Sequence, residues 1–237
     1  MIKNILFDFG GTLDTNGIHW SEKFWEVYKE FNVPLLKSDF EAAFVSSNIK
    51  IKELIDTNDD LKSTLRKEVE CQFDFLLQNE FLENAGTNHL IEEIVEKCVH
   101  DAKSEIIKSR KLLNRLRKNY KIGIVSNYHG NLKTVLRSEG LDEVDVIIDS
   151  EVEQIFKPDP KIFQLAIKRL QAKPSETVVI GDSYSRDIDP AKKLGCTTVW
   201  LDVKSYTKPK DTSDADYTVK SLYDIEKIID KINNKKY

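Results

Sequence analysis

Five short apolar runs limit what this chain can fold into. They are rich in Ile and Val and do not alternate with polar residues. They occupy residues 5–7, 122–125, 144–148, 178–180 and 198–201. Runs of this kind are typical of strands that are buried on both faces of a parallel sheet. Helix-like patterns separate most of them, so the chain is predicted to have an α/β fold with a parallel sheet.

The predicted helices of this α/β part follow the strands. They are expected at residues 131–138, 160–170 and 185–194, with a last one at 222–232. Basic residues cluster at 108–121, but they alternate with leucines and Tyr120, which favours a solvated face of an amphipathic helix.

The long interval between the first two runs contains no convincing strand. Residues 15–99 carry helix signatures, with apolar side chains on one face at Phe24, Tyr28 and Phe31, and again at Leu61, Leu65 and Val69. Ser21 is expected to be an N-cap, and Ser38 followed by Glu41 predicts a capping box. We therefore expect a helical domain at 15–100, entered through the flexible pair Asn16-Gly17, inserted into a core made of 1–14 and 101–237.

Charge and composition narrow the partners and the location. The 237 residues include 36 basic and 40 acidic side chains, so a net charge of −4 gives no support for a nucleic-acid partner. No apolar stretch is long enough to cross a bilayer, so no membrane partner is expected. Three widely spaced cysteines without metal or redox spacing indicate reduced thiols, and the N-terminus lacks signal-peptide anatomy. These features predict a cytoplasmic protein; they predict no particular oligomeric state.

Polar residues stand where three of the predicted strands end. Asp8 follows the first run, Ser126 the second and Asp182 the fourth. Any one of them alone would be read more simply as a turn or capping residue. Ligands of open parallel sheets bind at the carboxyl ends of the strands, so the three together predict a shared crevice.

The segments around these residues resemble four motifs of one family. Residues 5–13, which read ILFDFGGTL, are similar to its first motif, and Ile124-Val125-Ser126-Asn127 is similar to the second. Lys157-Pro158-Asp159-Pro160 resembles the third, and Gly181-Asp182 with Asp187 resembles the fourth. The motifs occur in the order found in the haloacid-dehalogenase-like (HAD) hydrolases. The resemblance implies a Rossmann-like parallel-sheet core, and the helical insertion resembles the cap domain of one large subgroup (C1).

The resemblance also implies a reaction and the residues that perform it. Asp8 would attack the phosphorus of a small phosphorylated metabolite, forming an aspartyl-phosphate that water hydrolyses. Mg²⁺ would be held by Asp8, Asp182, the carbonyl of Gly10 and Asp187. This agrees with chemistry, because neighbouring carboxylates repel unless a cation lies between them. The phosphoryl group would be bound by Gly11, Ser126, Asn127 and Lys157.

One position departs from the family pattern. Most phosphatases of the family carry a second Asp two residues after the nucleophile as general acid and base, and this chain has Gly10 there. General acid–base help is worth about 10²–10⁴-fold, so the difference matters. The residues that could replace it are Asp14, His19 and His129.

Gly10 is also compatible with two kinds of protein that need no acid at this position. Family phosphonatases have a small residue there and form an imine with a cap lysine, for which Lys37, Lys50 and Lys52 are available. Alternatively, the protein binds a phosphorylated ligand and barely turns it over. The dehalogenases that give the family its name also lack the second Asp, but they work without metal, so Asp182 and Asp187 favour a metal-dependent enzyme.

Overall fold

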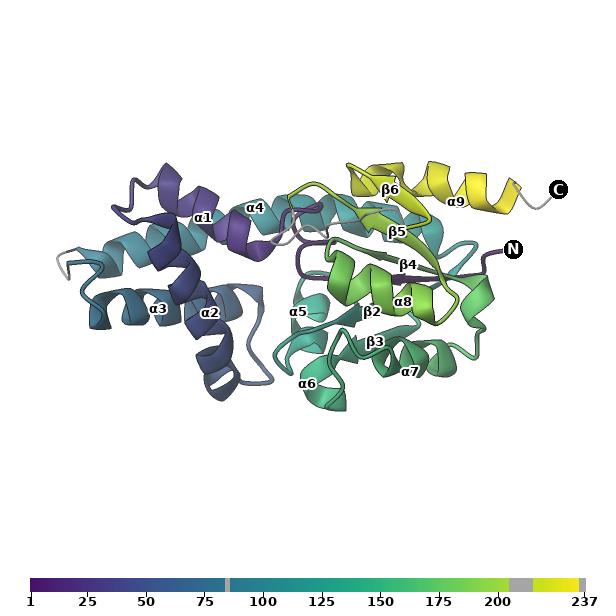
Figure 1. Ribbon diagram of the computed structural model, residues 1–237, viewed down its shortest axis with the longest axis horizontal. Helices are drawn as coiled ribbons and strands as arrows, with labels where there is room; N and C mark the ends of the chain where they lie inside the picture. Colours follow the sequence, from purple (N-terminus) through teal and green to yellow (C-terminus); the bar gives the residue numbers. More distant parts are fainter. Residues whose placement is uncertain (84–85, 205–214, 235–237) are drawn as a thin grey trace.

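A six-stranded parallel sheet forms the core of the computed structural model, which describes residues 1–83, 86–204 and 215–234 (Figure 1). The strand order is β3-β2-β1-β4-β5-β6. The strands are β1 (Asn4–Phe7), β2 (Lys121–Ser126), β3 (Val146–Asp149), β4 (Thr177–Gly181), β5 (Thr197–Leu201) and β6 (Tyr217–Val219). The α/β class with a parallel sheet is thereby confirmed. Residues 84–85, 205–214 and 235–237 of the expected domain ranges lie outside the described residues.

The register of the sheet brings the predicted strand ends to one edge. Phe7 at the end of β1 is level with Ile124 in β2 and with Ile180 in β4. The residues that follow, including Asp8 and Asp182, therefore leave the sheet side by side.

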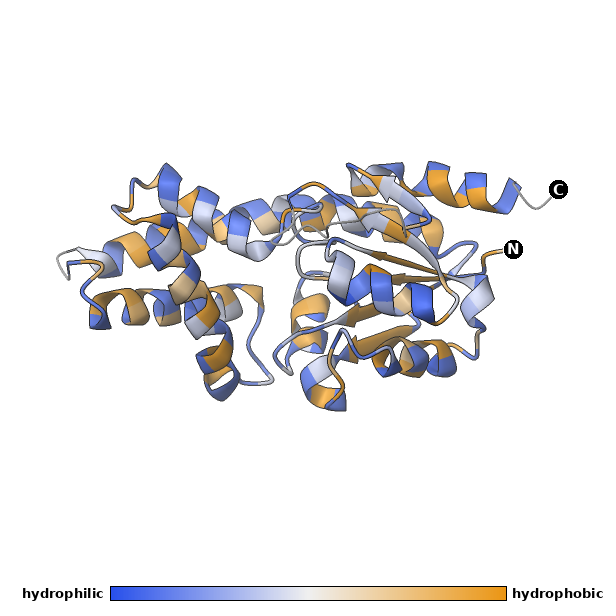
Figure 2. Cartoon of the chain, in the orientation of Figure 1, coloured by the Kyte–Doolittle hydropathy of each residue, from blue (hydrophilic) through white to orange (hydrophobic). Residues whose placement is uncertain are grey.

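Helices cover both faces of the sheet. Strand β1 directs Ile5 and Phe7 toward one face and Leu6 toward the other, and each side belongs to a different apolar cluster. The helices of this half are α5 (Leu132–Ser138), α6 (Ser150–Glu153), α7 (Lys161–Arg169), α8 (Asp189–Lys193) and α9 (Ile225–Asn234). Helix α7 packs on the Leu6 side through Ile162 and Phe163, whereas α5 and α9 pack on the other side. In Figure 2 the central strands are largely hydrophobic, as expected of a sheet buried on both faces.

Four helices form the other half of the molecule, which lies beside the sheet in Figure 1. They are α1 (Trp20–Glu30), α2 (Lys37–Leu54), α3 (Leu61–Gln78) and α4 (Thr87–Leu116). Their shared core includes Tyr28, whose ring lies 5.3 Å from Phe40 and 5.6 Å from Phe73. Helix α4 continues from this half along the sheet as one helix of 30 residues, and residue 100 lies within it.

Several local predictions need correction. The N-cap of α1 is His19, whose Nδ1 accepts from the Ser21 amide, so Ser21 lies inside the first turn. Helix α2 begins after Leu36 without a side-chain cap, so the predicted capping box at Ser38 is wrong. The helix expected at 185–194 is a π-helical turn, Tyr184–Ile188, followed by α8. Strand β6 was not predicted, because only Val219 of its three residues is buried. Within the described residues, none of the helices has the length and hydrophobicity needed to cross a membrane.

Candidate active site

Four polar side chains meet at the carboxyl edge of the sheet. Asp8 follows β1, Ser126 ends β2 and Asp187 lies in the turn after β4. Ser126 Oγ donates a 3.0 Å hydrogen bond to Asp8 Oδ1. Lys157, from the loop between α6 and α7, donates to Asp8 Oδ1 at 2.7 Å and to Asp187 Oδ1 at 2.6 Å. The side chain of Lys157 is only 2% exposed, so one ammonium group is buried between two carboxylates.

Three buried carboxylates form a cluster around this lysine. Asp8, Asp182 and Asp187 each present an oxygen within 4.8 Å of the others. Burial, reinforced by the charges of Asp8 and Asp187, raises the pKa of Asp182 well above its usual range. Burial also raises the pKa of Asp187 to about 6, against the attraction of Lys157. The cluster therefore carries more negative charge than a single ammonium group neutralises.

The backbone that follows Asp8 passes close to the side chain of Asp182. Gly11 has a φ of +93°, and a Cβ at this position would lie 2.6 Å from Asp182 Oδ1, so only glycine fits. Thr12 Oγ1 donates to Asp182 Oδ1 at 3.1 Å and lies 3.5 Å from Asp8 Oδ2, which connects the first and fourth motifs.

Asn127 fixes the position of Lys157. Its Oδ1 accepts from the Lys157 amide at 2.8 Å, and its Nδ2 donates to the Lys157 carbonyl at 3.0 Å. Burial alone would lower the pKa of Lys157, but the carboxylates of Asp187 and Asp8 outweigh it, and the pKa is raised above its usual value. The lysine therefore stays charged where it lies.

Asp14 and Trp20 lie beside Gly10, the position where the family pattern is broken. Asp14 Oδ1 accepts from the Gly11 amide and its Oδ2 accepts from Trp20 Nε1, each at 2.7 Å. A Cβ on Gly10 would lie 3.7 Å from Trp20 Cδ1 and 3.9 Å from Trp20 Nε1. Burial raises the pKa of Asp14 to about 7, although its two hydrogen bonds oppose the shift. The pKa of Asp14 therefore lies near neutrality.

The two histidines have different surroundings. His19 Nδ1 lies 2.8 Å from Ser21 Oγ, and burial, helped by the charge of Arg186, lowers the pKa of His19 to about 4. His129 Nε2 lies 3.0 Å from Glu68 Oε1 of α3, so it connects the loop after β2 to the helical half.

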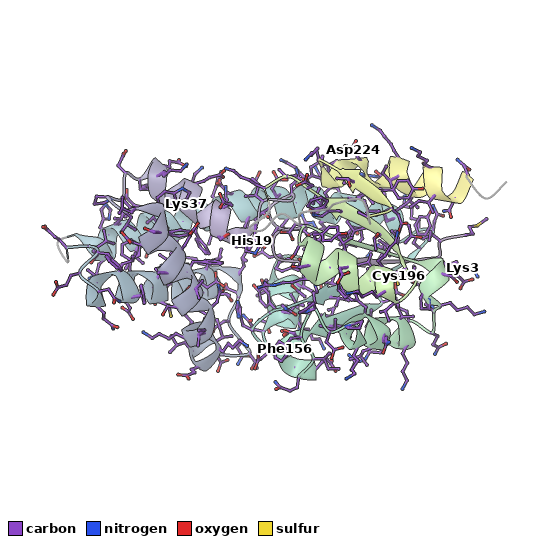
Figure 3. The ribbon with its side chains drawn as sticks, viewed as in Figure 1. Lys3, His19, Lys37, Phe156, Cys196 and Asp224 are labelled. Carbon is purple, nitrogen blue, oxygen red and sulfur yellow. The ribbon has the colours of Figure 1, made fainter. Side chains whose placement is uncertain are left out.

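A cavity of about 550 Å³ lies where the two halves meet. Gly10, Asp14 and Lys157 line it from the sheet side, and α1, α2 and α3 supply the opposite wall. Figure 3 places His19 at the junction of the two halves and Phe156, which also lines the cavity, beside α6. The structure therefore brings the predicted acid–base candidates and the lysine to one cavity.

Some residues of this region were not singled out from the sequence. Thr12 stood within the first motif, where its spacing from Asp8 could have indicated its role. Trp20, Glu68 and Arg186 belong to no motif, and only the fold brings them to the cavity.

Comparisons with known proteins identify the family. The model of the haloacid dehalogenase-like hydrolases matches residues 2–195. The glyceraldehyde 3-phosphate phosphatase of Pyrococcus furiosus is 33% identical over 136 residues, which are 54% of this chain and 56% of that protein. The chain thus spans little more than half the length of this curated relative.

Solved structures extend the likeness over nearly the whole chain. The HAD phosphatase from Thermococcus onnurineus has a TM-score of 0.54 and 26% identity, covering 96% of this chain and 98% of the other. The L-2-haloacid dehalogenase from Xanthobacter autotrophicus has a TM-score of 0.61 and 18% identity, over 97% and 98%, a likeness of fold alone. The chain belongs to the family of haloacid dehalogenase-like hydrolases.

Proposed function

We propose that this hydrolase is a Mg²⁺-dependent phosphatase that acts on a small phosphorylated metabolite through Asp8. The observation that carries the proposal is the buried cluster of Asp8, Asp182 and Asp187 around Lys157. A dehalogenase mechanism gives no reason to bury two further carboxylates beside the nucleophile, because each costs desolvation energy and repels the others.

The residues present fit a magnesium ion. Their carboxylate oxygens are hard ligands, they converge within 4.8 Å, and their charge exceeds that of Lys157. Asp8, Asp182 and the carbonyl of Gly10 would hold the ion, with Asp187 as a direct or water-mediated ligand. When bound, the ion neutralises the charge between the nucleophile and the phosphoryl oxygens.

The chain's own residues divide the reaction into two steps. The carboxylate of Asp8 attacks phosphorus and displaces the alcohol, and water then hydrolyses the aspartyl-phosphate. Ser126 Oγ and Lys157 Nζ, which both reach Asp8 Oδ1, are placed to donate to the phosphoryl oxygens as charge develops there. The Gly11 amide contributes backbone that can lie close to the phosphate. Asn127 acts through Lys157, whose backbone it holds on both sides.

We assign the proton transfers to Asp14 before the two histidines. Its carboxyl lies beside Gly10, with a pKa of about 7, which suits a group that must give and take a proton near neutral pH. His19 has a pKa of about 4 and is neutral at that pH, so it could accept but not donate. His129 is engaged by Glu68. The helical half would act as the cap that closes the cavity over the substrate.

The phosphonatase alternative now has one specific candidate. Of the three lysines considered, Lys52 lines the cavity, and its ammonium lies 3.4 Å from Glu151 Oε2 and 4.8 Å from the ring centroid of Phe156. An amine that attacks a carbonyl must be neutral, so Lys52 would first have to give up this ion pair. We therefore rank phosphonate cleavage below ester hydrolysis.

Turnover of an aryl phosphate tests the proposal directly. Its good leaving group needs little protonation, so the reaction should proceed even with Gly10. We expect phosphate release that requires Mg²⁺ and is lost in Asp8→Asn. If no phosphate were released but phosphate still bound, the protein would be a ligand-binding protein instead.

Borohydride trapping on phosphonoacetaldehyde tests the phosphonatase alternative. It should give no adduct, and an adduct at Lys52 would favour the phosphonatase.

A further inference from the structure

We propose that the cavity binds an apolar leaving group, so that the substrates are phosphate monoesters of alkyl or aryl alcohols rather than of polyhydroxylated ones. This inference rests on the proposed phosphatase activity for the identity of the reacting group. It concerns the rest of the substrate, which lies away from Asp8.

The first observation is the face that α2 presents to the cavity. Phe44, Val45 and Ile49 all line it, and Val45 and Ile49 are 50% and 72% exposed. Single exposed apolar residues are ordinary, but these two lie one helical turn apart and face the same hollow. Other exposed apolar residues, such as Ile107 on α4, lie elsewhere.

Aromatic side chains extend this apolar face around the cavity. Trp20 lies next to Gly10, and Tyr128 and Phe156 line the sheet side. The apolar surface thus begins beside Gly10 and continues toward α2. Asp8 itself does not line the cavity, but Lys157 does and donates to Asp8 Oδ1 at 2.7 Å, so the leaving group of a phosphoryl held by Lys157 would extend into the cavity.

The second observation is that most polar groups of the cavity already have partners in the protein. Lining residues with a hydrogen bond or ion pair are Lys52, Thr64, Glu68, Asn127, His129 and Ser150. Within the described part of the chain, two polar residues of the lining have no such partner. They are Asn48 and Arg186, and both are exposed. Hydroxyl groups of a sugar phosphate would lose water here and find few replacements, which is unfavourable.

The size of the cavity is sufficient for such a group. About 550 Å³ is within the range of sites that bury most of a small organic ligand. Each methylene that moves from water into an apolar site should strengthen binding by about fourfold. The inference therefore predicts a regular dependence of affinity on chain length.

The test uses alkyl phosphonates from ethyl to octyl, which the phosphatase reaction does not cleave, so binding is measured whether or not turnover occurs. With Mg²⁺ present, calorimetry should show a dissociation constant that falls about twofold to fourfold for each added methylene until the cavity is filled. A dissociation constant independent of length, or no binding of any member, would overturn the inference. The aryl-phosphate assay separately reports on the proposed function.

Two variants test where the alkyl chain of the ligand lies in the cavity. Ile49→Ser should raise the dissociation constant of octyl phosphonate by about threefold to tenfold and leave that of ethyl phosphonate unchanged. Ile107→Ser, at a position 46% exposed but away from the cavity, is the matched control and should change neither. Equal effects of the two variants would mean that the apolar face of α2 does not hold the leaving group.

Discussion

The edge of the sheet and the opposite wall of the cavity are built in contrasting ways. At the edge, Asp8, Lys157 and Asp187 are held by one another in full burial, with the lysine side chain 2% exposed. On the wall, Ile49 is 72% exposed and has no comparable constraint. The first region is held by contacts among buried charges, whereas the side chain of Ile49 is mostly exposed, so substitutions there should affect the fold little.

This difference indicates that the two regions have different functions, one in the reaction and the other in binding. Chemistry that depends on distances between charged atoms is carried by residues that follow the strands, where the sheet register fixes them, and by Lys157, whose loop is held by Asn127. Selection of the leaving group is assigned to helices that pack among themselves and only border the reacting atoms. Variants at the edge should therefore cost activity, and variants on the wall should change binding.

The largest effect is expected for Asp182→Asn. Replacing a carboxylate by an amide of the same shape should weaken Mg²⁺ binding and reduce aryl-phosphate turnover by about 10³-fold or more, because the ion supplies several kcal/mol of charge stabilisation. The fold should persist, since Trp200 Nε1 donates to the Asp182 backbone carbonyl and not to its side chain. Turnover and Mg²⁺ affinity are the measurements, with circular dichroism as the control. Equal activity of the wild type in Mg²⁺ and in excess EDTA would contradict the metal-dependent mechanism.

Removal of metal should make stability depend on pH at the edge of the sheet. The pKa values of Asp14 and Asp187 are raised to about 7 and about 6 in the folded protein, from 3.8. The stability that results is complete below pH 3.8 and is lost as pH rises through 6 and 7, where these carboxyls must ionise. In EDTA the free energy of unfolding should thus fall from pH 5 to pH 8, by about 1.4 kcal/mol per pH unit for each group still protonated.

Urea unfolding from pH 5 to pH 8 measures this slope. Asp14→Asn should make the slope shallower, because the raised pKa values of Asp187 and Asp182 still contribute, whereas Asp142→Asn, at an exposed position, should leave it unchanged. Mg²⁺ at pH 8 should restore stability, because a cation among the carboxylates favours their ionised form. A slope that is the same in all three proteins would contradict the assignment to Asp14.

The same contrast accounts for how much the sequence could predict. The buried strands and the residues at their ends follow from local apolar patterns and from motifs, so the α/β fold and the meeting of Asp8 with Lys157 were predictable. Strand β6 and the N-cap of α1 were not, since the strand has one buried residue and a histidine replaces the expected serine. Trp20 and Glu68 reach the cavity only through the packing of the helical half, for which no local pattern exists.

A smaller effect is expected from Gly10→Asp, which gives the edge its missing carboxylate. The Cβ would make ordinary contact with Trp20 at 3.7 Å, and the Gly10 backbone is not in the left-handed region. Both oxygens of Asp14 accept hydrogen bonds, from the Gly11 amide and from Trp20, so Asp14 should deprotonate the water less effectively than a carboxylate at position 10. Rapid quench of the wild type on an aryl phosphate should therefore show a burst followed by slow turnover, as the aspartyl-phosphate accumulates. Gly10→Asp should speed the slow phase by about 10-fold to 100-fold, with Gly10→Asn as the matched control.

A rapid-quench time course of the wild type without a burst would contradict this prediction. If the rate also depended equally on the leaving group before and after the substitution, Asp14 or one of the histidines would already do the acid–base work as effectively as a carboxylate at position 10. Mutation of Asp14, and then of His19 and His129, would identify the residue responsible.

The smallest effect is expected at a contact between the helical half and the carboxyl edge of the sheet. Glu68 of α3 lies 3.0 Å from His129, with side chains 15% and 14% exposed, and this contact joins the helical half to the loop after β2. Glu68→Gln should cost about 1 kcal/mol of stability or less, as for other polar contacts between partly exposed side chains. It should leave the pH dependence of turnover in place, because the protons are assigned to Asp14. Glu70→Gln, on the same helix and 3.8 Å from Arg66, is the control. A pH–rate profile that moves in Glu68→Gln but not in Asp14→Asn would transfer the acid–base role to His129.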